Sequence, residues 1–295
     1  MHFPRTQFPM TATQFELLGR DPVPELPEVE TVVRDLRPLL IGRTITAIRI
    51  GNKKLRKPWS PDWNAEVIGA TTTAIRRRGK WILAGLDSGA VLLVHLGMTG
   101  QFTAVSAGEP EPDHLHFAFA LSDGSELRYR DTRRFGSVQW IASDALVQLA
   151  FGEKLGHEPF DIPANAFASA MQSSNRCLKA LLLDQSILAG VGNIYADESL
   201  FRAKLHPQTL GSALTRAECN RLRLAVEAVI AEAIDGRGST IRDYVGGSGL
   251  RGGYQREFAV YGRTGEPCVK CGKEIEMLRV AGRASHVCPR CQKRK

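Results

Sequence analysis

Four cysteines near the end of the chain constrain its folding more than any other sequence feature. They form two C-x-x-C pairs, Cys268 with Cys271 and Cys288 with Cys291, with sixteen residues between the pairs. Each pair fits one tight turn, so four thiolates can close a tetrahedral site that leaves no open position for a substrate. The spacing therefore predicts a zinc ribbon with one structural Zn²⁺.

The other candidate ligands are left out of this site. His286 lies close to Cys288, but four thiolates already fill the shell. Cys177 and Cys219 are isolated and are interpreted as small buried apolar residues.

The start of the chain lacks the features of a secretory signal, and no apolar run approaches the ~20 residues of a membrane-spanning helix. We therefore expect a cytoplasmic location and no membrane partner.

The net charge favours a polyanionic partner. The 295 residues contain 39 Lys and Arg against 31 Asp and Glu, a formal charge of +8. Most of this excess lies between Cys268 and Lys295, where eight basic and two acidic residues give +6. A module with that charge is expected to bind a phosphate backbone, although a solubility surplus is the alternative.

Hydrophobic patterning predicts a β-sandwich over residues 24–150. Residues 1–23 have no periodicity and are predicted to be disordered. A helix begins just after Pro24 and stops at Gly42. Runs rich in Val, Ile, Leu and Thr then predict strands at 44–50, 72–78, 80–86, 90–96, 115–121, 125–131 and 137–142. Turns at 87–89 and 122–124 join two of these pairs as antiparallel hairpins.

Beyond a boundary near residue 155 the pattern becomes helical. Apolar residues from Leu178 to Ile187 predict one helix, the loop 190–193 breaks it, and a short helix follows at 195–201. Thr215 and Glu218 form a capping box for a longer helix, which Gly236 closes. The glycine-rich segment 246–257 is either a plain linker or a lid, and 258–295 hold the cysteine module.

Other sequence features, each considered alone, do not indicate a functional site. The basic clusters 76–80 and 128–134 are interpreted as solvated faces. His114 and His116, two residues apart, are interpreted as an exposed pair rather than metal ligands. The loop 190–193 lacks the third glycine and the βαβ pattern of a dinucleotide-binding turn.

Taken together, seven segments resemble the bacterial formamidopyrimidine-DNA glycosylase family. They are PELPEVET (24–31), RRRGKW (76–81), HLGMTG (95–100), DTRRFG (131–136), LLLDQSILAGVGNIYADESLF (181–201), VYGRTGEPC (260–268) and the cysteine module. The resemblance covers nearly all of residues 24–295. It implies an α+β multidomain fold: an N-terminal β-sandwich with a leading helix, a helix-two-turn-helix domain at 155–245 and a C-terminal β-hairpin zinc finger.

The resemblance also implies an activity and its catalytic residues. The family removes oxidised purines, such as 8-oxoguanine and formamidopyrimidines, from double-stranded DNA and then cuts the abasic strand. Pro24 corresponds to the nucleophile, whose secondary amine forms a Schiff base with the sugar C1′. Glu25 corresponds to the acid/base group, Lys80 to the proton donor of β-elimination, and Arg283 to the residue of δ-elimination. Glu28 is expected to support the same pocket.

Further residues match the family's DNA-binding positions. Met98, Arg133 and Phe135 correspond to the set that fills the hole left when a nucleotide is flipped out. Lys179 and Asn193 correspond to phosphate-binding positions, which His95 and His114 are expected to join. Segment 246–257 occupies the position of a mobile lesion-capping loop. The partner is double-stranded DNA with oxidised bases or abasic sites, and we expect a monomer.

One departure from the family concerns the nucleophile itself. The family begins Met-Pro-Glu, whereas Val23 precedes Pro24 here. A proline nitrogen inside a peptide bond is an amide and cannot form a Schiff base. We therefore expect translation to start at position 23; if Pro24 is blocked, the protein is a non-catalytic DNA-binding module. An endonuclease VIII-like glycosylase for oxidised pyrimidines is the other alternative, against which Leu26 and the set Met98, Arg133, Phe135 argue.

Overall fold

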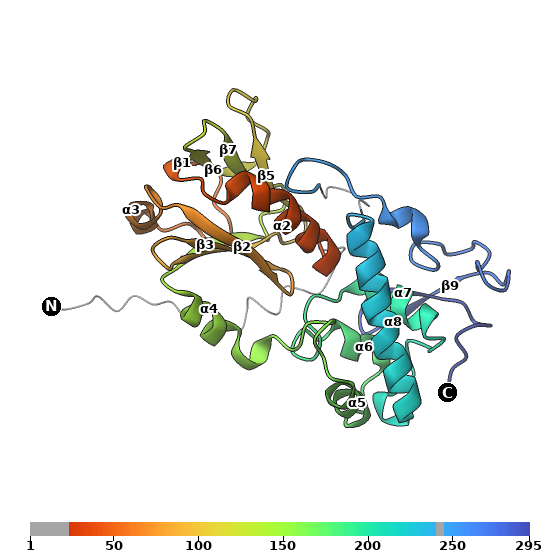
Figure 1. Cartoon of the computed structure of the whole chain (residues 1–295). Coiled ribbons are helices and arrows are strands. Elements are labelled where there is room, and N and C mark those ends of the chain that lie inside the picture. Colours follow the sequence, from red (N-terminus) through yellow and green to blue (C-terminus); the bar gives the residue numbers. More distant parts are fainter. Residues whose placement is uncertain (1–23, 240–244) are drawn as a thin grey trace.

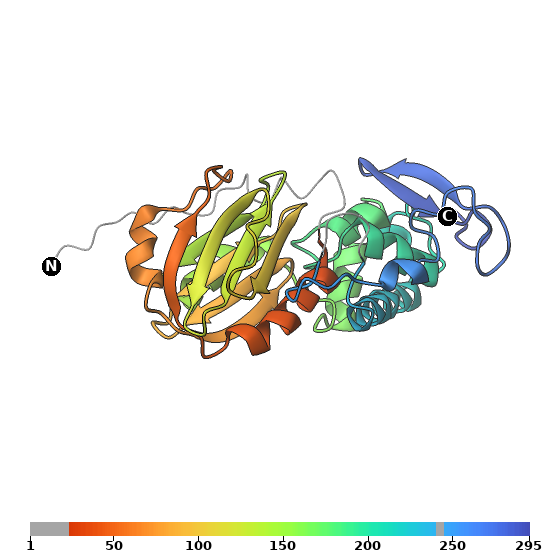
Figure 2. The same ribbon diagram turned by 90° about the horizontal axis from the view of Figure 1, so that it is seen from above.

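The computed structural model describes residues 24–239 and 245–295. The expectations for residues 1–23 lie outside this range. Figures 1 and 2 show a β-sandwich beside a helical part, with a C-terminal hairpin on the far side of the helices. This arrangement confirms the α+β fold expected from the sequence.

The sandwich consists of two four-stranded antiparallel sheets. One has the order β1-β6-β7-β5 and the other β2-β3-β4-β8. The strands are β1 (Ile45–Ile50), β2 (Thr72–Arg78), β3 (Trp81–Leu86), β4 (Val91–His95), β5 (Gly100–Val105), β6 (Leu115–Leu121), β7 (Glu126–Asp131) and β8 (Ser137–Ile141). The seven expected strands are present and both predicted hairpins pair antiparallel. Strand β5 was not expected, because a segment opening on glycine has a weak strand signal.

Helix α2 (Leu26–Leu40) joins the two parts of the molecule. It begins with Glu25 as N-cap and is followed by Gly42, as predicted. Leu26 packs in the core of the helical part, whereas Val29 and Leu36 pack in the core of the sandwich. The first turn of α2 therefore lies at the junction of the two cores, beside the tip of the β2–β3 hairpin.

Within the described residues, four α-helices form the helical part: α5 (Ala164–Gln172), α6 (Leu178–Leu183), α7 (Asn193–Arg202) and α8 (Arg216–Asp235). Helix α4 (Asp144–Phe151) precedes them and packs on strands β4 and β8 of the sandwich. The capping box of Thr215 with Glu218 starts α8, and Gly236 ends it, as predicted. The expectation for Ile187 was wrong: α6 ends four residues earlier, because the chain turns at Asp184, which accepts hydrogen bonds from Ser186.

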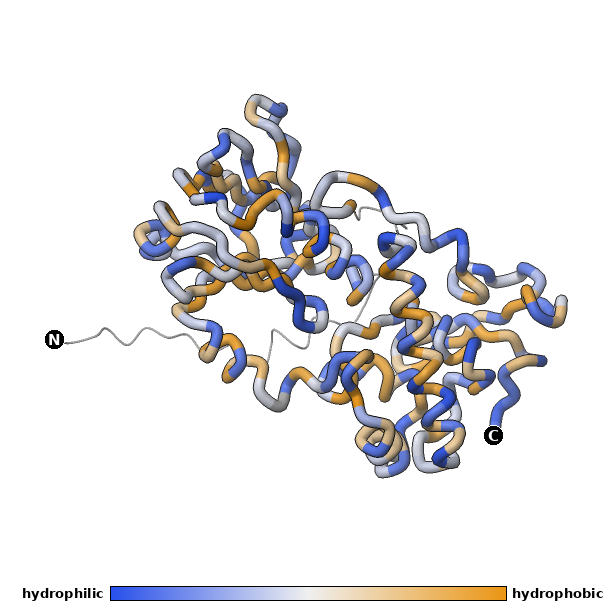
Figure 3. Tube along the Cα trace, viewed as in Figure 1, coloured by the Kyte–Doolittle hydropathy of each residue, from blue (hydrophilic) through white to orange (hydrophobic). Residues whose placement is uncertain are grey.

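Short helical turns connect these elements. They are η1 (Pro61–Trp63), α3 (Asn64–Val67), η2 (Gly152–Lys154), η3 (Gly211–Ala213) and η4 (Tyr254–Glu257). Apolar residues gather in the interior of both parts and hydrophilic residues at the tip of the β2–β3 hairpin (Figure 3). Within the two described ranges, no helix has the length and apolar character needed to cross a membrane.

The glycine-rich segment has contacts with the sandwich. The carbonyl of Gly247 accepts a hydrogen bond of 3.0 Å from the N–H of Ala104 in β5. The hydroxyl of Ser248 donates to Asp35 of α2 at 2.9 Å. Groups of the chain itself thus hold part of the segment that the sequence left as either a linker or a lid, and residues 254–257 form η4.

Candidate active site and nucleic-acid interface

The carboxylate of Glu25 lies at the N-terminus of helix α7. Its oxygens accept hydrogen bonds from the N–H groups of Gly192 at 2.8 Å, Ile194 at 2.9 Å and Tyr195 at 3.3 Å. The first N–H groups of a helix have no partners within the helix and attract negative charge. The turn before α7 therefore fixes the position of the Glu25 carboxylate, next to Pro24.

Gly192 is required by this contact. A Cβ atom at position 192 would lie 2.3 Å from Cδ of Glu25 and 2.5 Å from its Oε1. Any larger residue would push the carboxylate out of its place. The loop 190–193 thus binds the carboxylate of Glu25 and holds it in place.

Glu28 supports the same region from one turn further along α2. Its carboxylate accepts hydrogen bonds from the hydroxyl of Tyr195 at 2.5 Å and from the N–H of Ser239 at 2.7 Å. It also accepts one from the N–H of Glu25 at 2.9 Å. Glu28 therefore orients the backbone at Glu25, and Tyr195 and Ser239 are site residues that the sequence did not reveal.

Lys80 brings a buried ammonium group to the two carboxylates. It lies at the tip of the β2–β3 hairpin with a relative exposure of only 6%. Burial lowers the pKa of Lys80, while the charges of Glu25 and Glu28 raise it. Burial raises the pKa of Glu25 to about 7, against the opposing effect of Lys80. A carboxyl with that pKa can both give and take a proton near neutral pH.

Arg283 contributes positive charge to this group from another domain. It is the first residue of β10 (Arg283–Val287), which pairs with β9 (Glu276–Val280). Its charge is close enough to Lys80 and Lys179 to lower their pKa values. The structure therefore brings together Pro24, Glu25, Lys80 and Arg283, which lie far apart in the sequence.

The basic cluster at 76–80 is not a solvated face. Glu158 accepts hydrogen bonds from Arg77 at 2.6 Å, from Arg78 at 2.9 Å and from the N–H of Gly79 at 2.7 Å. Arg77 also pairs with Glu30 at 2.9 Å. These guanidinium groups fasten the hairpin tip, so the simple interpretation was wrong for Arg77 and Arg78. The partner acid lies 80 residues away in sequence, which hid the contact.

Lys179 is buried between α6 and α7 and is held by partners inside the chain. Its side chain is fully buried, and its Nζ donates to Asp197 at 2.5 Å and to the carbonyl of Asn193 at 2.9 Å. Asp197 also accepts hydrogen bonds from the N–H of His286 at 2.9 Å and from its Nδ1 at 3.1 Å. The ammonium group of Lys179 thus has two partners inside the chain, and its expected phosphate contact stays a prediction. Asp197, paired with Lys179, also connects α7 to strand β10 through its hydrogen bonds with His286.

Other residues of α7 also hold the C-terminal module. Asn193 donates from Nδ2 to the carbonyl of Ala284 at 3.1 Å, next to Arg283. Glu198 accepts hydrogen bonds from the N–H groups of Val260 and Tyr261 at 2.9 and 2.8 Å. Helix α7 thus positions Glu25 at its N-terminus and the hairpin of Arg283 along its side.

Met98, Arg133 and Phe135 come from two loops at one end of the sandwich. Met98 lies half-buried in the β4–β5 turn, and the other two lie in the β7–β8 loop. The Arg133 guanidinium lies 5.0 Å from the Phe135 ring centroid, and that of Arg56 lies 4.4 Å from it. No sequence pattern indicated that Arg56 lies beside Phe135.

The histidines have separate environments. The ring of His95 contacts that of Trp81 in a tilted arrangement, with 4.6 Å between the ring centroids, and its Nδ1 accepts a hydrogen bond of 3.0 Å from the N–H of Gly97. Burial, together with the charges of Lys80 and Lys57, lowers the pKa of His95 to about 3. The ring is therefore neutral with its proton on Nε2, which leaves one donor for a ligand.

His114 and His116 do not form an exposed pair. His116 is buried and bonds to the carbonyls of Lys53 at 2.7 Å and Asp131 at 2.9 Å. His114 is half-buried in the turn before β6, with a φ of 62°. The pair interpretation was wrong because the strand starts only at Leu115, so the two side chains do not share its face.

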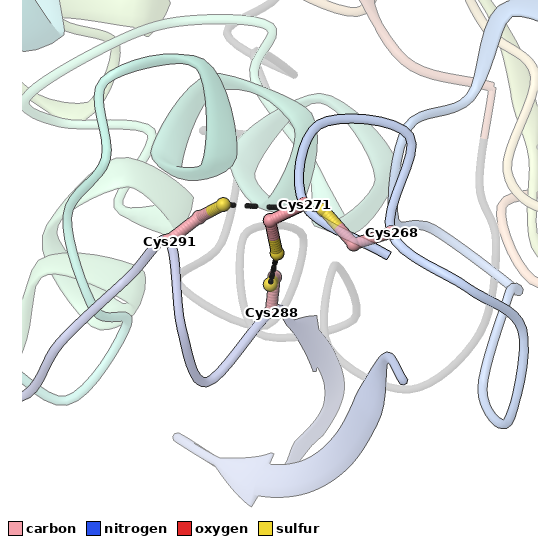
Figure 4. Close-up of side chains that lie close together, drawn as sticks. All are labelled: Cys268, Cys271, Cys288 and Cys291. Carbon is pink, nitrogen blue, oxygen red and sulfur yellow. Dashed lines mark hydrogen bonds between the residues drawn. The ribbon is translucent and has the colours of Figure 1, made fainter. Parts of the chain in front are cut away.

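Four cysteine sulfurs converge beside the β9–β10 hairpin (Figure 4). All four Sγ atoms lie within 4.8 Å of one another, with 3.5 Å between Cys271 and Cys288 and 4.0 Å between Cys268 and Cys291. Tetrahedral zinc with Zn–S bonds of about 2.3 Å needs sulfurs about 3.8 Å apart. The donor set fits one structural zinc ion, and His286 is not part of it.

Comparison with known families matches three consecutive parts of the chain. Residues 23–138 match the formamidopyrimidine-DNA glycosylase N-terminal domain, and residues 155–245 match the formamidopyrimidine-DNA glycosylase H2TH domain. Residues 265–294 match a zinc finger found in FPG and IleRS. Over 278 residues the chain is 45% identical to the formamidopyrimidine-DNA glycosylase of Geobacillus kaustophilus, covering 92% of this chain and 100% of that protein.

Solved structures agree with these matches. An FPG variant from Lactococcus lactis in complex with DNA containing Fapy-dG has a TM-score of 0.86 and 34% identity. The MutM (FPG) protein of Thermus thermophilus has a TM-score of 0.80 and 41% identity. Each comparison covers 92% of this chain and all of the other.

Proposed function

Because the chain belongs to the formamidopyrimidine-DNA glycosylase family, we propose that it excises oxidised purines, such as 8-oxoguanine and formamidopyrimidines, from duplex DNA and then cuts the abasic strand. The observation that carries the proposal is the convergence of Glu25, Lys80 and Arg283 beside Pro24, on three elements that meet only in the folded protein. We further propose that it acts as a monomer in the cytoplasm.

The first step forms a bond between the nitrogen of Pro24 and C1′ of the damaged nucleotide. The base leaves with the electrons of its glycosidic bond and takes up a proton, and Glu25 supplies a proton to the sugar oxygen as the ring opens. The pKa of Glu25, raised to about 7 by burial, suits this task. The product is an iminium between the protein and the opened sugar.

The strand is then cut by elimination from this iminium. Glu25, which lost its proton in the first step, takes a proton from C2′; a C2′=C3′ double bond forms, and the 3′ phosphate leaves with the electrons of its C3′–O bond, with Lys80 as proton donor. A second elimination expels the 5′ phosphate, which the fixed charge of Arg283 stabilises. The charge of Lys80 acts on Glu25 and that of Arg283 acts on Lys80, which supports one site for both stages.

Flipping the damaged nucleotide out of the helix requires a replacement for its stacking. Met98 and Phe135 serve as apolar wedges, and Arg133 donates hydrogen bonds to the base left without a partner. His95 and Asn193 are proposed to bind the backbone phosphates, together with His114.

The proposal is tested with duplex oligonucleotides that carry 8-oxoguanine, thymine glycol or no lesion. We expect the chain that begins at Pro24 to release 8-oxoguanine at least tenfold faster than thymine glycol and to leave the undamaged duplex intact. Faster release of thymine glycol would assign the protein to oxidised pyrimidines. DNA binding without excision would leave a non-catalytic protein.

A further inference from the structure

The two loops that carry Met98, Arg133 and Phe135 are both crossings between the sheets of the sandwich. The β4–β5 turn passes from one sheet to the other, and the β7–β8 loop passes back. The neighbouring ladders end at the pairs His95 with Ser137 and Gly100 with Asp131. Strand pairing therefore ends just where the two loops begin, and something else must hold the loops together.

Asp131, the last residue of β7, makes this connection. Its side chain is fully buried. One carboxylate oxygen accepts hydrogen bonds from the hydroxyl of Thr99 at 2.6 Å and from the N–H of Arg133 at 3.2 Å. The other accepts from the N–H of Gly136 at 2.8 Å. A buried carboxylate needs hydrogen-bond donors, and those of Asp131 come from both loops, so its side chain holds the two loops together.

Thr99 completes the connection. Its hydroxyl oxygen accepts a hydrogen bond of 3.0 Å from the N–H of Arg133 while donating to Asp131. The turn that carries Met98 is thereby bonded directly to the backbone of the residue proposed to contact the opposite base. Residue 99 therefore acts on Met98 and Arg133 together.

The two loops are also in close backbone contact. A Cβ atom at Gly97 would lie 2.5 Å from the backbone nitrogen of Gly136, and one at Gly136 would lie 2.5 Å from the carbonyl oxygen of His95. That carbonyl also accepts the hydroxyl of Tyr129 at 3.1 Å. With no space for side chains between them, the loops move as one body once Asp131 binds both.

We propose that Asp131, acting with Thr99, is a positioning residue that sets Met98, Arg133 and Phe135 as one wedge for the hole in the duplex. This inference rests on the proposed function. The wedge acts only when a nucleotide is flipped out of a duplex, so Asp131 matters for that step and not for the reaction at the sugar. Misplacement of a positioned group by about 1 Å lowers rates by about 100-fold.

The test compares two substrates that differ in their need for the wedge. One is duplex DNA with 8-oxoguanine opposite cytosine or adenine, and the other is an abasic site in single-stranded DNA. For Asp131→Asn, we expect kcat/KM on the duplex to fall by about 100-fold and the preference for the opposite base to be lost. Cleavage of the single strand stays within about threefold of wild type.

Two further variants keep the result interpretable if Asp131→Asn folds poorly. Thr99→Val removes the bridging hydroxyl and is expected to repeat the loss on duplex DNA, whereas Thr99→Ser retains the hydroxyl and is expected to restore the activity. Asp123→Asn is the matched control, because Asp123 accepts hydrogen bonds from Ser125 at the opposite end of β7.

The outcomes separate this inference from the proposed function. All variants are made in the chain that begins at Pro24, and inactivity of this chain without substitutions on both substrates refutes the proposed function. Wild-type rates on duplex DNA for both Asp131→Asn and Thr99→Val overturn the role of Asp131. An equal loss on both substrates also overturns it, because a general structural defect does not distinguish a duplex from a single strand.

Discussion

The carboxylate of Glu25 accepts a hydrogen bond of 2.9 Å from the backbone N–H of Ile194, 169 residues away in the sequence. This bond joins the residue next to the proposed nucleophile to the first turn of α7. The same helix holds strand β10 through Asp197, and β10 begins with Arg283. One helix thus sets the relative positions of the proposed acid/base group, Glu25, and of the cation proposed to bind phosphate, Arg283.

Substituting Gly192 tests whether the position of the Glu25 carboxylate controls the reaction. In Gly192→Ala the new Cβ lies 2.3 Å from Cδ of Glu25 and displaces the carboxylate. We expect excision of 8-oxoguanine to fall by about 100-fold and stability to fall by about 1–3 kcal/mol. Gly85→Ala is the matched control, because its Cβ would make only ordinary contacts, the nearest with Oγ1 of Thr73 at 3.6 Å. Equal rates for the two variants would contradict the role of Gly192.

The raised pKa of Glu25 predicts a pH-dependent stability. Its pKa is about 7 in the fold against 4.5 for an ordinary glutamate, so the folded state binds this proton more tightly than the unfolded state. The proton therefore stabilises the fold fully below pH 4.5, and this contribution is lost as the pH rises through 7. The maximum is about 3 kcal/mol.

Urea unfolding of wild type and Glu25→Gln at pH 5 and pH 8 measures this contribution. Glutamine does not titrate, so we expect the free energy of unfolding of wild type, relative to the variant, to be larger at pH 5. A difference that is the same at both values would show that Glu25 has an ordinary pKa.

Because Lys179 is buried, we expect its substitution to lower stability without changing the salt dependence of DNA binding. Lys179→Met leaves the buried charge of Asp197 without its ammonium partner, which is expected to cost about 3–5 kcal/mol of stability. The slope of log K against log salt for DNA binding should stay at the wild-type value. A slope smaller by about one would mean that Lys179 does contact a phosphate.

Removal of the metal is predicted to weaken DNA binding before it affects chemistry. The buried sulfurs of Cys268 and Cys288 pack with Phe201 of α7 and Ile275, so the metal site stabilises the small core of the hairpin module. We expect chelation or Cys271→Ser to lower duplex affinity at least tenfold, as measured by fluorescence anisotropy, with the circular dichroism of the sandwich retained. Cys177→Ser, at an isolated free thiol, should bind as wild type does.

Local patterns in the sequence predicted the elements that depend on nearby residues. The capping box of Thr215 with Glu218, the turns at 87–89 and 122–124 and the two cysteine pairs each involve residues within a few positions of one another. Local hydrogen bonding and metal geometry select these structures almost alone. The family resemblance then identified Glu25, Lys80 and Arg283, which no local pattern marks as one group.

The remaining features depend on partners distant in the sequence. Lys179 was matched to a phosphate-binding position of the family, and nothing near it in the sequence shows that it pairs with Asp197 inside the fold. Glu158, which fastens the hairpin tip of Lys80, and Asp131, which joins two loops, look like ordinary acidic residues until the sheets and helices are assembled. A buried charge is recognised only with its partners in place.

The nucleophilic role of Pro24 is tested most directly by borohydride trapping on duplex DNA with an abasic site. The chain that begins at Pro24 is compared with the full 295-residue chain. We predict a covalent protein–DNA adduct, mapped to Pro24, only for the chain with the free amine. No adduct from that chain, or equal adducts from both, would contradict the assignment of Pro24 as the Schiff-base nucleophile.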